Sequence, residues 1–383
     1  MKTANRTYST VRWRRMRELA GLLLCLALLL SLCPAGLAEE ASGSGDPGSV
    51  ITDSTVTAEA AIQQRRPDVD GLPGPMPVRD CYGAVPVDQA YVLNGVIQRA
   101  RDSGLLGQDE VTAFDPNANF YVGLFGRNIE YYLDDSILVI LWKENVEGYC
   151  CSFCEVKIRD ASQFRRKLAE DTYGSDYQYF ASELAAQTNA VVAMNADYYL
   201  PRAYGIVVWN RELCRFNTEN YAAGYLKYNC LDTLFINEEG DFLYKRMGEE
   251  NTPESIEAYV RDNGIVFSLA FGPLLVENGE AVPCAWYPMG EVNDGYSRAG
   301  IGQMGKLHYL HMSLNHGNKE ARWTATQFAQ HFADRPVQTA YCLDGGQTGE
   351  VVFDGVPYNY MDYGVERKVS DILYFTALPE AAG

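Results

Sequence analysis

Histidine is scarce in this chain, and positive charge falls short of negative charge. Four histidines occur in 383 residues, and they form no HExxH or similar metal-binding pattern: His308, His311, His316 and His331. The first two fall in an expected strand, where they predict a polar strand face. Lys and Arg number 32 against 50 Asp and Glu, a formal net charge of −18 at pH 7. Because an acidic surface repels phosphate backbones, we expect no nucleic-acid partner.

A second pair of zinc-binding cysteines is also missing. Cys151-Ser152-Phe153-Cys154 is a single CxxC motif in a β-rich stretch, without the partner Cys or His residues that a zinc site needs. A redox motif of this type should open a helix. We therefore expect a structural role for these cysteines, either as a disulfide or as buried thiols. No cofactor is predicted, and a bound divalent cation is left open.

The N-terminal segment has the layout of a secretory signal peptide. Four arginines between residues 12 and 17 precede the apolar run from Leu19 to Leu32, and small residues up to Ala38 follow it. Cleavage of residues 1–38 would remove six basic residues and one acid, taking the net charge from −18 to −23. We expect a secreted or cell-surface protein, with membrane contact only through an uncleaved signal segment. No Asn-x-Ser/Thr acceptor follows residue 38 (Asn251-Thr252-Pro253 does not qualify), which favours a bacterial exported protein.

The rest of the chain divides into three parts and contains no internal repeat. Residues 39–80 are rich in Gly, Ser and Pro and predict a flexible linker. Residues 81–130 predict a helical lead-in, because Leu93, Val96, Ile97 and Ala100 are spaced as one helix face. Residues 131–377 alternate short apolar strands with helices. The expected fold class is α/β (α+β), with a mixed β-sheet core flanked by helices in a single large domain.

Polar residues gather at the ends of three expected strands. These clusters are Asn195-Ala196-Asp197-Tyr198-Tyr199, Ser297-Arg298-Ala299-Gly300-Ile301-Gly302 and Asp344-Gly345-Gly346-Gln347-Thr348-Gly349. Two adjacent glycines can present successive N–H groups to an anion. Each cluster also has a structural explanation as a strand cap, an ion pair or a hairpin turn. Taken singly, each cluster leaves both interpretations open.

Together, the clusters resemble the phosphodiester glycosidase family in order and flanking sequence. The segments that carry the resemblance are Ala193 to Tyr199, Phe271-Gly272-Pro273-Leu274-Leu275-Val276-Glu277-Asn278-Gly279, Ser297 to Gly302, Tyr341 to Thr348 and Arg367-Lys368-Val369-Ser370-Asp371-Ile372-Leu373-Tyr374. The similarity extends from about Tyr131 to Phe375. The sequence departs from the family where Ala196 replaces a glycine and where Leu314-Asn315-His316-Gly317 replaces Asp-Gly-Arg.

The resemblance implies an exported hydrolase that cleaves a sugar, such as N-acetylglucosamine, from a sugar-1-phosphodiester at the anomeric carbon. Its substrate would be a glycan or wall-polymer phosphodiester, as in an exopolysaccharide or cell wall. Arg298 would neutralise the phosphate leaving group, and Asp344 or Asp197 would act as nucleophile or as base. The implied substrate-binding residues are Asn195, Gly345, Gly346, Thr348, Tyr198 and Tyr199. The alternatives are a non-catalytic glycan- or wall-binding module on the same fold and a metal-assisted phosphodiesterase.

Overall fold

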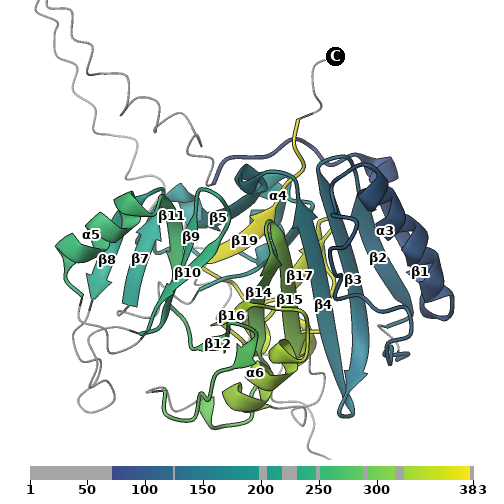
Figure 1. The fold of residues 1–383 in the computed structure, drawn as a ribbon. Coiled ribbons are helices and arrows are strands. Elements are labelled where there is room, and N and C mark those ends of the chain that lie inside the picture. The colour runs from purple at the N-terminus through teal and green to yellow at the C-terminus, as the bar shows by residue number, and fades with distance from the viewer. Residues whose placement is uncertain are drawn as a thin grey trace, which may run out of the picture. The chain divides into compact units, whose positions relative to one another are not determined.

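A computed structural model describes residues 71–123, 126–197, 205–217, 231–246, 251–287, 292–314 and 323–379 (Figure 1). The expected signal peptide, Tyr198, Tyr199 and Asn315 to Gly317 lie outside these described residues. Every strand pair within the described ranges is antiparallel. The predicted mixed fold with sheets flanked by helices is therefore confirmed, in its α+β form.

Two large sheets form the centre of the domain. The nine-stranded sheet runs in the order β1 (Tyr82–Pro86), β2 (Asn128–Leu133), β3 (Ile137–Val146), β4 (Tyr149–Ile158), β15 (His308–Leu314), β14 (Ala299–Gly305), β16 (Thr339–Leu343), β12 (Leu274–Glu277) and β13 (Glu280–Ala281). The five-stranded sheet runs in the order β18 (Val356–Pro357), β17 (Val351–Phe353), β6 (Val192–Asn195), β19 (Asp371–Phe375) and β5 (Phe164–Leu168). The smaller sheets are β10 (Phe242–Lys245), β9 (Thr233–Asn237) and β11 (Ile265–Leu269), and β7 (Gly205–Trp209) with β8 (Glu212–Asn217).

Alternating side chains pack the two large sheets face to face. Val192 and Met194 of β6 join a core with Leu141 of β3 and Ile301 of β14. The intervening Ala193 packs on the other face, in a separate cluster with α4 (Ala181–Thr188). This period of two is what the pleat of a strand imposes on its side chains. The five-stranded sheet therefore has one face on the large sheet and the other on α4.

Helices cover the outer face of the nine-stranded sheet. The stripe on α3 (Leu93–Asp102) is buried as its spacing predicted. The apolar face of α6 (Ala325–Ala333) is buried in the same core. Thr324 caps α6 by accepting the N–H of Gln327 at 3.2 Å. The fourth helix, α5 (Pro253–Asp262), lies beside β8 and β11 (Figure 1).

Hydrogen bonds tie the segments before residue 131 to the sheets. β1 pairs with β2 and forms the edge of the nine-stranded sheet. The main-chain oxygen of Leu72 accepts from Arg165 at 3.0 Å and from the Tyr374 hydroxyl at 3.1 Å. The N–H of Gly74 donates to the Thr188 oxygen at 2.8 Å. Residues 72–74 and 82–86 thus form part of the domain's hydrogen-bond network.

Two cysteines of β4 and two histidines of β15 are buried in the core. Cys151 and Cys154 are free thiols, buried on opposite faces of β4. Of the two roles left open for the CxxC motif, the structure has buried thiols. The predicted polar face of β15 was wrong, because His308 and His311 are both buried and face opposite sides of the strand.

His308 lies at the centre of a buried ionic cluster, which we call the His308 clamp. Its Nδ1 lies 2.8 Å from Glu110 Oε1, and its Nε2 lies 2.8 Å from Glu155 Oε1. The other oxygen of Glu155 accepts the N–H groups of Ala113 and Phe114 at 3.0 and 2.9 Å. The clamp therefore fastens the segment around residues 110–114 to the nine-stranded sheet.

Candidate active site

The three polar clusters meet where β6 and β16 end and β14 begins. The chain leaves β16 at Leu343 and forms a loop from Asp344 to Gly349, which includes a short 3-10 helix at Gly346–Thr348. The N–H of Asp344 donates to the Ala196 oxygen at 3.2 Å, just beyond β6. The N–H of Gly346 donates to the Ser297 oxygen at 2.9 Å, just before β14. Segments about 150 residues apart in the chain are thus joined through the 344–349 loop.

Asn195 holds this loop against the five-stranded sheet. Its Nδ2 donates to the main-chain oxygen of Asp344, and its Oδ1 accepts the N–H of Glu350 at 3.1 Å. The N–H of Asn195 also donates to the Glu350 oxygen at 3.1 Å. With an exposed fraction of 1%, the side chain lies within the protein. The amide that the sequence assigned to substrate binding thus positions both ends of the loop.

Internal hydrogen bonds and close packing fix the loop's shape. The N–H of Gly345 donates to the Asp344 carboxylate at 2.9 Å, and the buried Thr348 hydroxyl donates to the Gly345 oxygen at 2.7 Å. A Cβ on Gly345 would lie 2.5 Å from the Ser297 main-chain oxygen. Gly346 has a positive φ of 65°, which favours glycine. The N–H groups expected to face an anion are donated to protein oxygens in this structure.

Arg298 links the loop to its surroundings. β14 and β16 pair with Ala299 opposite Leu343, so continuing this register by one residue places Arg298 opposite Asp344. The guanidinium is buried and donates to the main-chain oxygens of Trp323 and Asp294, each at 2.9 Å. Its positive charge therefore lies at the β14 end, on the strand next to Asp344.

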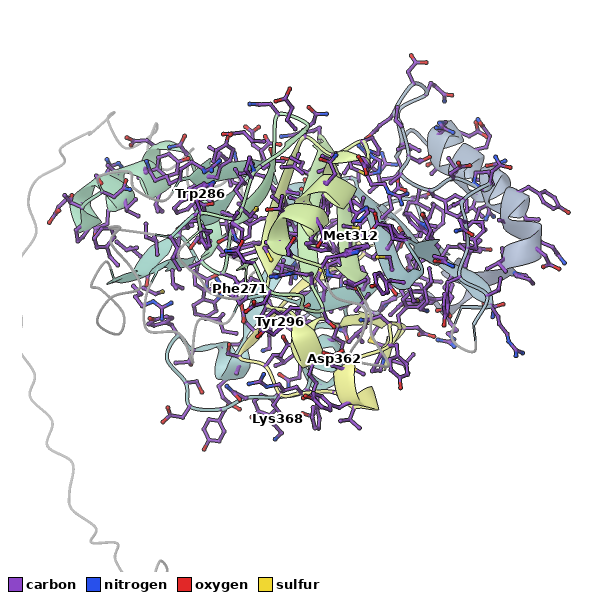
Figure 2. All side chains as sticks on the ribbon, turned by 90° about the horizontal axis from the view of Figure 1, so that it is seen from below. Phe271, Trp286, Tyr296, Met312, Asp362 and Lys368 are labelled. Atoms are coloured by element: carbon purple, nitrogen blue, oxygen red, sulfur yellow. The ribbon has the colours of Figure 1, made fainter. Side chains whose placement is uncertain are left out.

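Tyr296 and Asp362 border the loop on the outside. The exposed Tyr296 ring has its centroid 5.7 Å from the Arg298 guanidinium carbon. Asp362 accepts a hydrogen bond of 3.0 Å from the Ser297 hydroxyl. Figure 2 labels both side chains, and the short 3-10 helix that begins at Asp362 contacts the one in the loop. An aromatic ring next to a cation suits a site for a polar, ring-shaped ligand.

Asp197 lies in a different environment, a buried ionic network. Its Oδ2 accepts the N–H of Ala270 at 2.8 Å and lies 3.8 Å from the Arg166 guanidinium, with 4% of the residue exposed. Arg166 donates to Asp371 Oδ2 from Nε at 2.8 Å, with Nη2 at 2.6 Å from the same oxygen, and to the main-chain oxygen of Ser268. Burial raises the pKa of Asp371 to about 6; the Arg166 charge opposes the rise, and Asp197 adds to it.

The structure thus divides the predicted site residues into two groups. Asp344, Gly345, Gly346, Thr348, Asn195 and Arg298 come together at the loop. Asp197 follows Asn195 in the chain but its carboxylate faces Arg166 and Ala270. Tyr198 and Tyr199 lie outside the described residues. Among the predicted carboxylates, only Asp344 lies in the half-exposed loop.

Two residues near the site were missed. Arg166 is on β5, far from every motif in the sequence, and gave no local signal. Glu350 directly follows the loop, where an acid precedes the apolar run of β17. It is fully buried, and neither of its carboxyl oxygens accepts a hydrogen bond from an N–H or a hydroxyl group. Burial, and to a lesser extent the charge of Glu366, raises the pKa of Glu350 to about 9.

The described ranges contain neither a metal-binding cluster nor a membrane-spanning helix. There, no group of three or more His, Cys, Asp or Glu side chains is arranged to hold a metal ion. No helix in that part of the chain is long and apolar enough to cross a bilayer.

Comparison with known proteins connects this arrangement to a family. Residues 188–376 match the family model of phosphodiester glycosidases. Among solved structures, the catalytic domain of zebrafish N-acetylglucosamine-1-phosphodiester alpha-N-acetylglucosaminidase, auto-inhibited by its pro-peptide, is 15% identical with a TM-score of 0.46, over 63% of this chain and 82% of that one. A hypothetical protein from Synechocystis is 13% identical with a TM-score of 0.46, over 64% and 63%.

A search of curated proteins gives no match. The family match spans the loop, β6, β14 and the closing strand β19, the segments on which the sequence resemblance was based. The resemblance is therefore confirmed: residues 188–376, just under half of the chain, match the phosphodiester glycosidase family.

Proposed function

We propose that this protein is a hydrolase that releases a sugar from a sugar-1-phosphodiester by cleaving the bond at the anomeric carbon. The family match suggests glycosidase chemistry on phosphodiesters. The observation that carries the proposal is the meeting of the 344–349 loop with Asn195 and Arg298 at neighbouring strand ends. This arrangement offers a carboxylate and a fixed cation close together, the pair that the reaction needs.

Asp344 is our choice for the carboxylate that acts on the sugar. It lies in a half-exposed loop, whereas Asp197 is buried and faces Arg166. An oxocarbenium-like transition state requires negative charge next to the anomeric carbon. Asp344 supplies it either as the nucleophile or as the base that takes a proton from the attacking water. Asp197 then has a positioning role, because its Oδ2 fixes the backbone at Ala270.

Arg298 is our choice for stabilising the leaving group. When the anomeric C–O bond breaks, the electron pair stays on the phosphate oxygen, and the departing phosphate monoester gains charge. A guanidinium carried by the residue opposite Asp344 in the strand register would stabilise that charge without having to give up a proton. Its hydrogen bonds to Trp323 and Asp294 hold it in place before the reaction. Such preorganisation lowers the barrier because little has to move during the reaction.

The finer identity of the substrate and the location are also part of the proposal. We propose N-acetylglucosamine as the sugar, a glycan or wall-polymer phosphodiester as the substrate, and export of the protein. The exposed aromatic ring of Tyr296 next to Arg298 supports a carbohydrate ligand. The N-terminal sequence, with its arginines and apolar run, supports export.

The direct test is sugar release by the purified full chain from a panel of sugar-1-phosphodiesters that differ in sugar and in aglycone. We expect free sugar as the product. In water carrying a heavy oxygen isotope, the label should appear on the sugar, because the C–O bond breaks. The configuration of the released sugar then distinguishes a nucleophilic Asp344, which gives retention, from a general base, which gives inversion.

Two outcomes would contradict the proposal. Absence of sugar release across the panel, with glycan binding unchanged in Asp344→Asn and Arg298→Lys, would indicate a binding module. Label on the phosphate, together with loss of activity in a chelator and recovery with a divalent cation, would indicate a metal-assisted phosphodiesterase. Arg298→Lys is the informative variant because it keeps the charge and removes the planar donor array.

A further inference from the structure

Glu350 lies directly beside the residue that holds the loop. It is one residue before β17, which pairs with β6 through Val351 and Met194. Two hydrogen bonds of 3.1 Å join Glu350 and Asn195, one between main-chain groups and one from the Glu350 N–H to the Asn195 side chain. By strand alternation both side chains lie on the α4 face of the five-stranded sheet. The Glu350 carboxyl group is therefore next to the amide that binds Asp344.

The surroundings of this carboxyl group do not compensate a negative charge. The residue has 0% exposure, and neither carboxyl oxygen accepts a hydrogen bond from an N–H or a hydroxyl group; the group in contact with it is the Glu366 carboxylate. The charged group that bears on it is another carboxylate, Glu366, which accepts hydrogen bonds from the Ser182 N–H at 3.1 Å and hydroxyl at 2.8 Å. A buried charge without a partner is costly, so the carboxyl group keeps its proton at neutral pH.

An uncharged acid suits a site for an anionic substrate. Asp344 already brings one carboxylate to the loop, and a phosphodiester brings a second negative charge. A further charge on Glu350 would act through a poorly screened interior, where repulsion between like charges is strong. A protonated Glu350 keeps its side-chain volume and its backbone hydrogen bonds to Asn195 without that repulsion.

We propose that Glu350 is a positioning residue of the candidate site: as an uncharged buried acid it holds Asn195 and the 344–349 loop in place for an anionic substrate. The reference to substrate rests on the proposed function. The claim about the carboxyl group's charge does not, because it follows from burial, from the absence of a donor or cation at its oxygens and from the neighbouring Glu366 carboxylate. Ionisation of Glu350 should therefore weaken binding of the anionic substrate.

The test compares the wild-type protein with Glu350→Gln, which keeps the shape and is always neutral. Glu130→Gln is the matched control, because burial also raises the pKa of Glu130, but this residue lies on β2 beside Lys143. We expect the KM of the wild-type protein for the phosphodiester to rise about tenfold between pH 8 and pH 10, with kcat changing less, as the Glu350 proton is lost. The KM of Glu350→Gln should stay flat, and Glu130→Gln should behave like the wild type.

Two further measurements separate this proposal from the function itself. Infrared spectra of the wild-type protein should contain a protonated carboxylic acid band at pH 7 that disappears near pH 9 and is missing in Glu350→Gln. The melting temperature of Glu350→Gln should exceed that of the wild type by at least about 2 °C at pH 8 and by less at pH 5. Both measurements apply even if no phosphodiester is cleaved. A wild-type spectrum without that band, or equal KM profiles in wild type and Glu350→Gln, would overturn the proposal.

Discussion

Two buried acids of this protein differ in whether donor groups hydrogen-bond to their carboxyl oxygens. In the His308 clamp, Glu155 bonds with His308, Ala113 and Phe114. Beside the candidate site, the carboxyl oxygens of Glu350 accept no hydrogen bond from a donor group, and their neighbour is another carboxylate, Glu366. His308 begins β15, while Leu314 ends it and donates its N–H to the Arg298 oxygen at 2.8 Å. The His308 clamp and the 344–349 loop thus lie near opposite ends of β15.

The difference separates stabilising interactions from functional ones. Buried polar groups are nearly always hydrogen-bonded, and exceptions concentrate at functional sites, where the rest of the fold compensates their cost. The clamp meets this rule and joins the first part of the chain to the sheet. Glu350 breaks the rule within the family-matched segment. We expect changes in the clamp to alter stability, and changes at the loop to alter activity.

The largest expected effect is on activity, in Asp344→Asn. Loss of the acting carboxylate should lower kcat for sugar release roughly 10²–10⁴-fold, with a melting temperature close to that of the wild type. The matched change in the clamp, Glu155→Gln, should do the reverse: it should lower the melting temperature and leave kcat within about twofold. Steady-state kinetics and thermal unfolding of both variants check this. Equal losses of activity in the two variants would mean that the clamp and the loop do not differ in function as proposed.

Arg166→Met should have the next largest effect, on stability. It leaves the carboxylates of Asp371 and Asp197 buried without their cation, which costs about 3–5 kcal/mol in comparable cases. Urea unfolding should show this loss, and adding Asp371→Asn should recover part of it because one unpaired charge is removed. A double variant no more stable than Arg166→Met would mean that the network is held by packing instead of charge.

The ion pair between Arg166 and Asp371 could not be predicted from the sequence, whereas other parts of the fold and the site could. The helices α3 and α6 could be predicted because their apolar spacing is local. The 344–349 loop, Asn195 and Arg298 could be predicted because they stand in motifs with a fixed order. Arg166 and Asp371 are 205 residues apart, and no local pattern reveals that β5 and β19 bring them together. The burial of His308 and His311 was missed for the same reason: it depends on segments distant in the sequence, which for His308 bring Glu110 and Glu155 to its ring.

The His308 clamp should also stabilise the protein most strongly within a limited pH range. Burial alone would raise the pKa of Glu110, but hydrogen bonds from His308 and Lys157 lower it from 4.5 to about 2. Its contribution is therefore present above about pH 4.5 and lost as the pH falls toward 2. Burial alone would lower the pKa of His308, but Glu110 and Glu155 raise it above 6.5. That contribution is present below about pH 6.5 and lost as the pH rises through the raised value.

His308→Gln tests this window. The free-energy difference from the wild type should be largest between about pH 4.5 and 6.5, at about 1–3 kcal/mol, and should shrink on either side. His331→Gln is the control, since its contact with Glu147 is a single partly exposed ion pair of 3.5 Å. Its cost should come mainly from the lost contact with the Trp323 ring, whose centroid lies 4.0 Å from that of His331, and should vary with pH by less than about 0.5 kcal/mol. A difference for His308→Gln that does not vary with pH would contradict the ionic origin of the clamp.

The smallest and most local effects should come from the two adjacent glycines. Alanine at 345 would place its Cβ 2.5 Å from the Ser297 oxygen and 3.4 Å from the Arg298 Cα, both main-chain atoms, so the loop must move away from β14. Alanine at 346 would meet no atom within 4 Å and would have only the unfavourable φ of 65°, a cost of about 1–2 kcal/mol. Because misplacing a reactive group costs more than local strain, Gly345→Ala should lower kcat at least about tenfold, while Gly346→Ala should keep most activity with a slightly lower melting temperature. Equal activity in the two variants would mean that contact between the loop and β14 does not set the position of Asp344, and that Asn195 alone holds it.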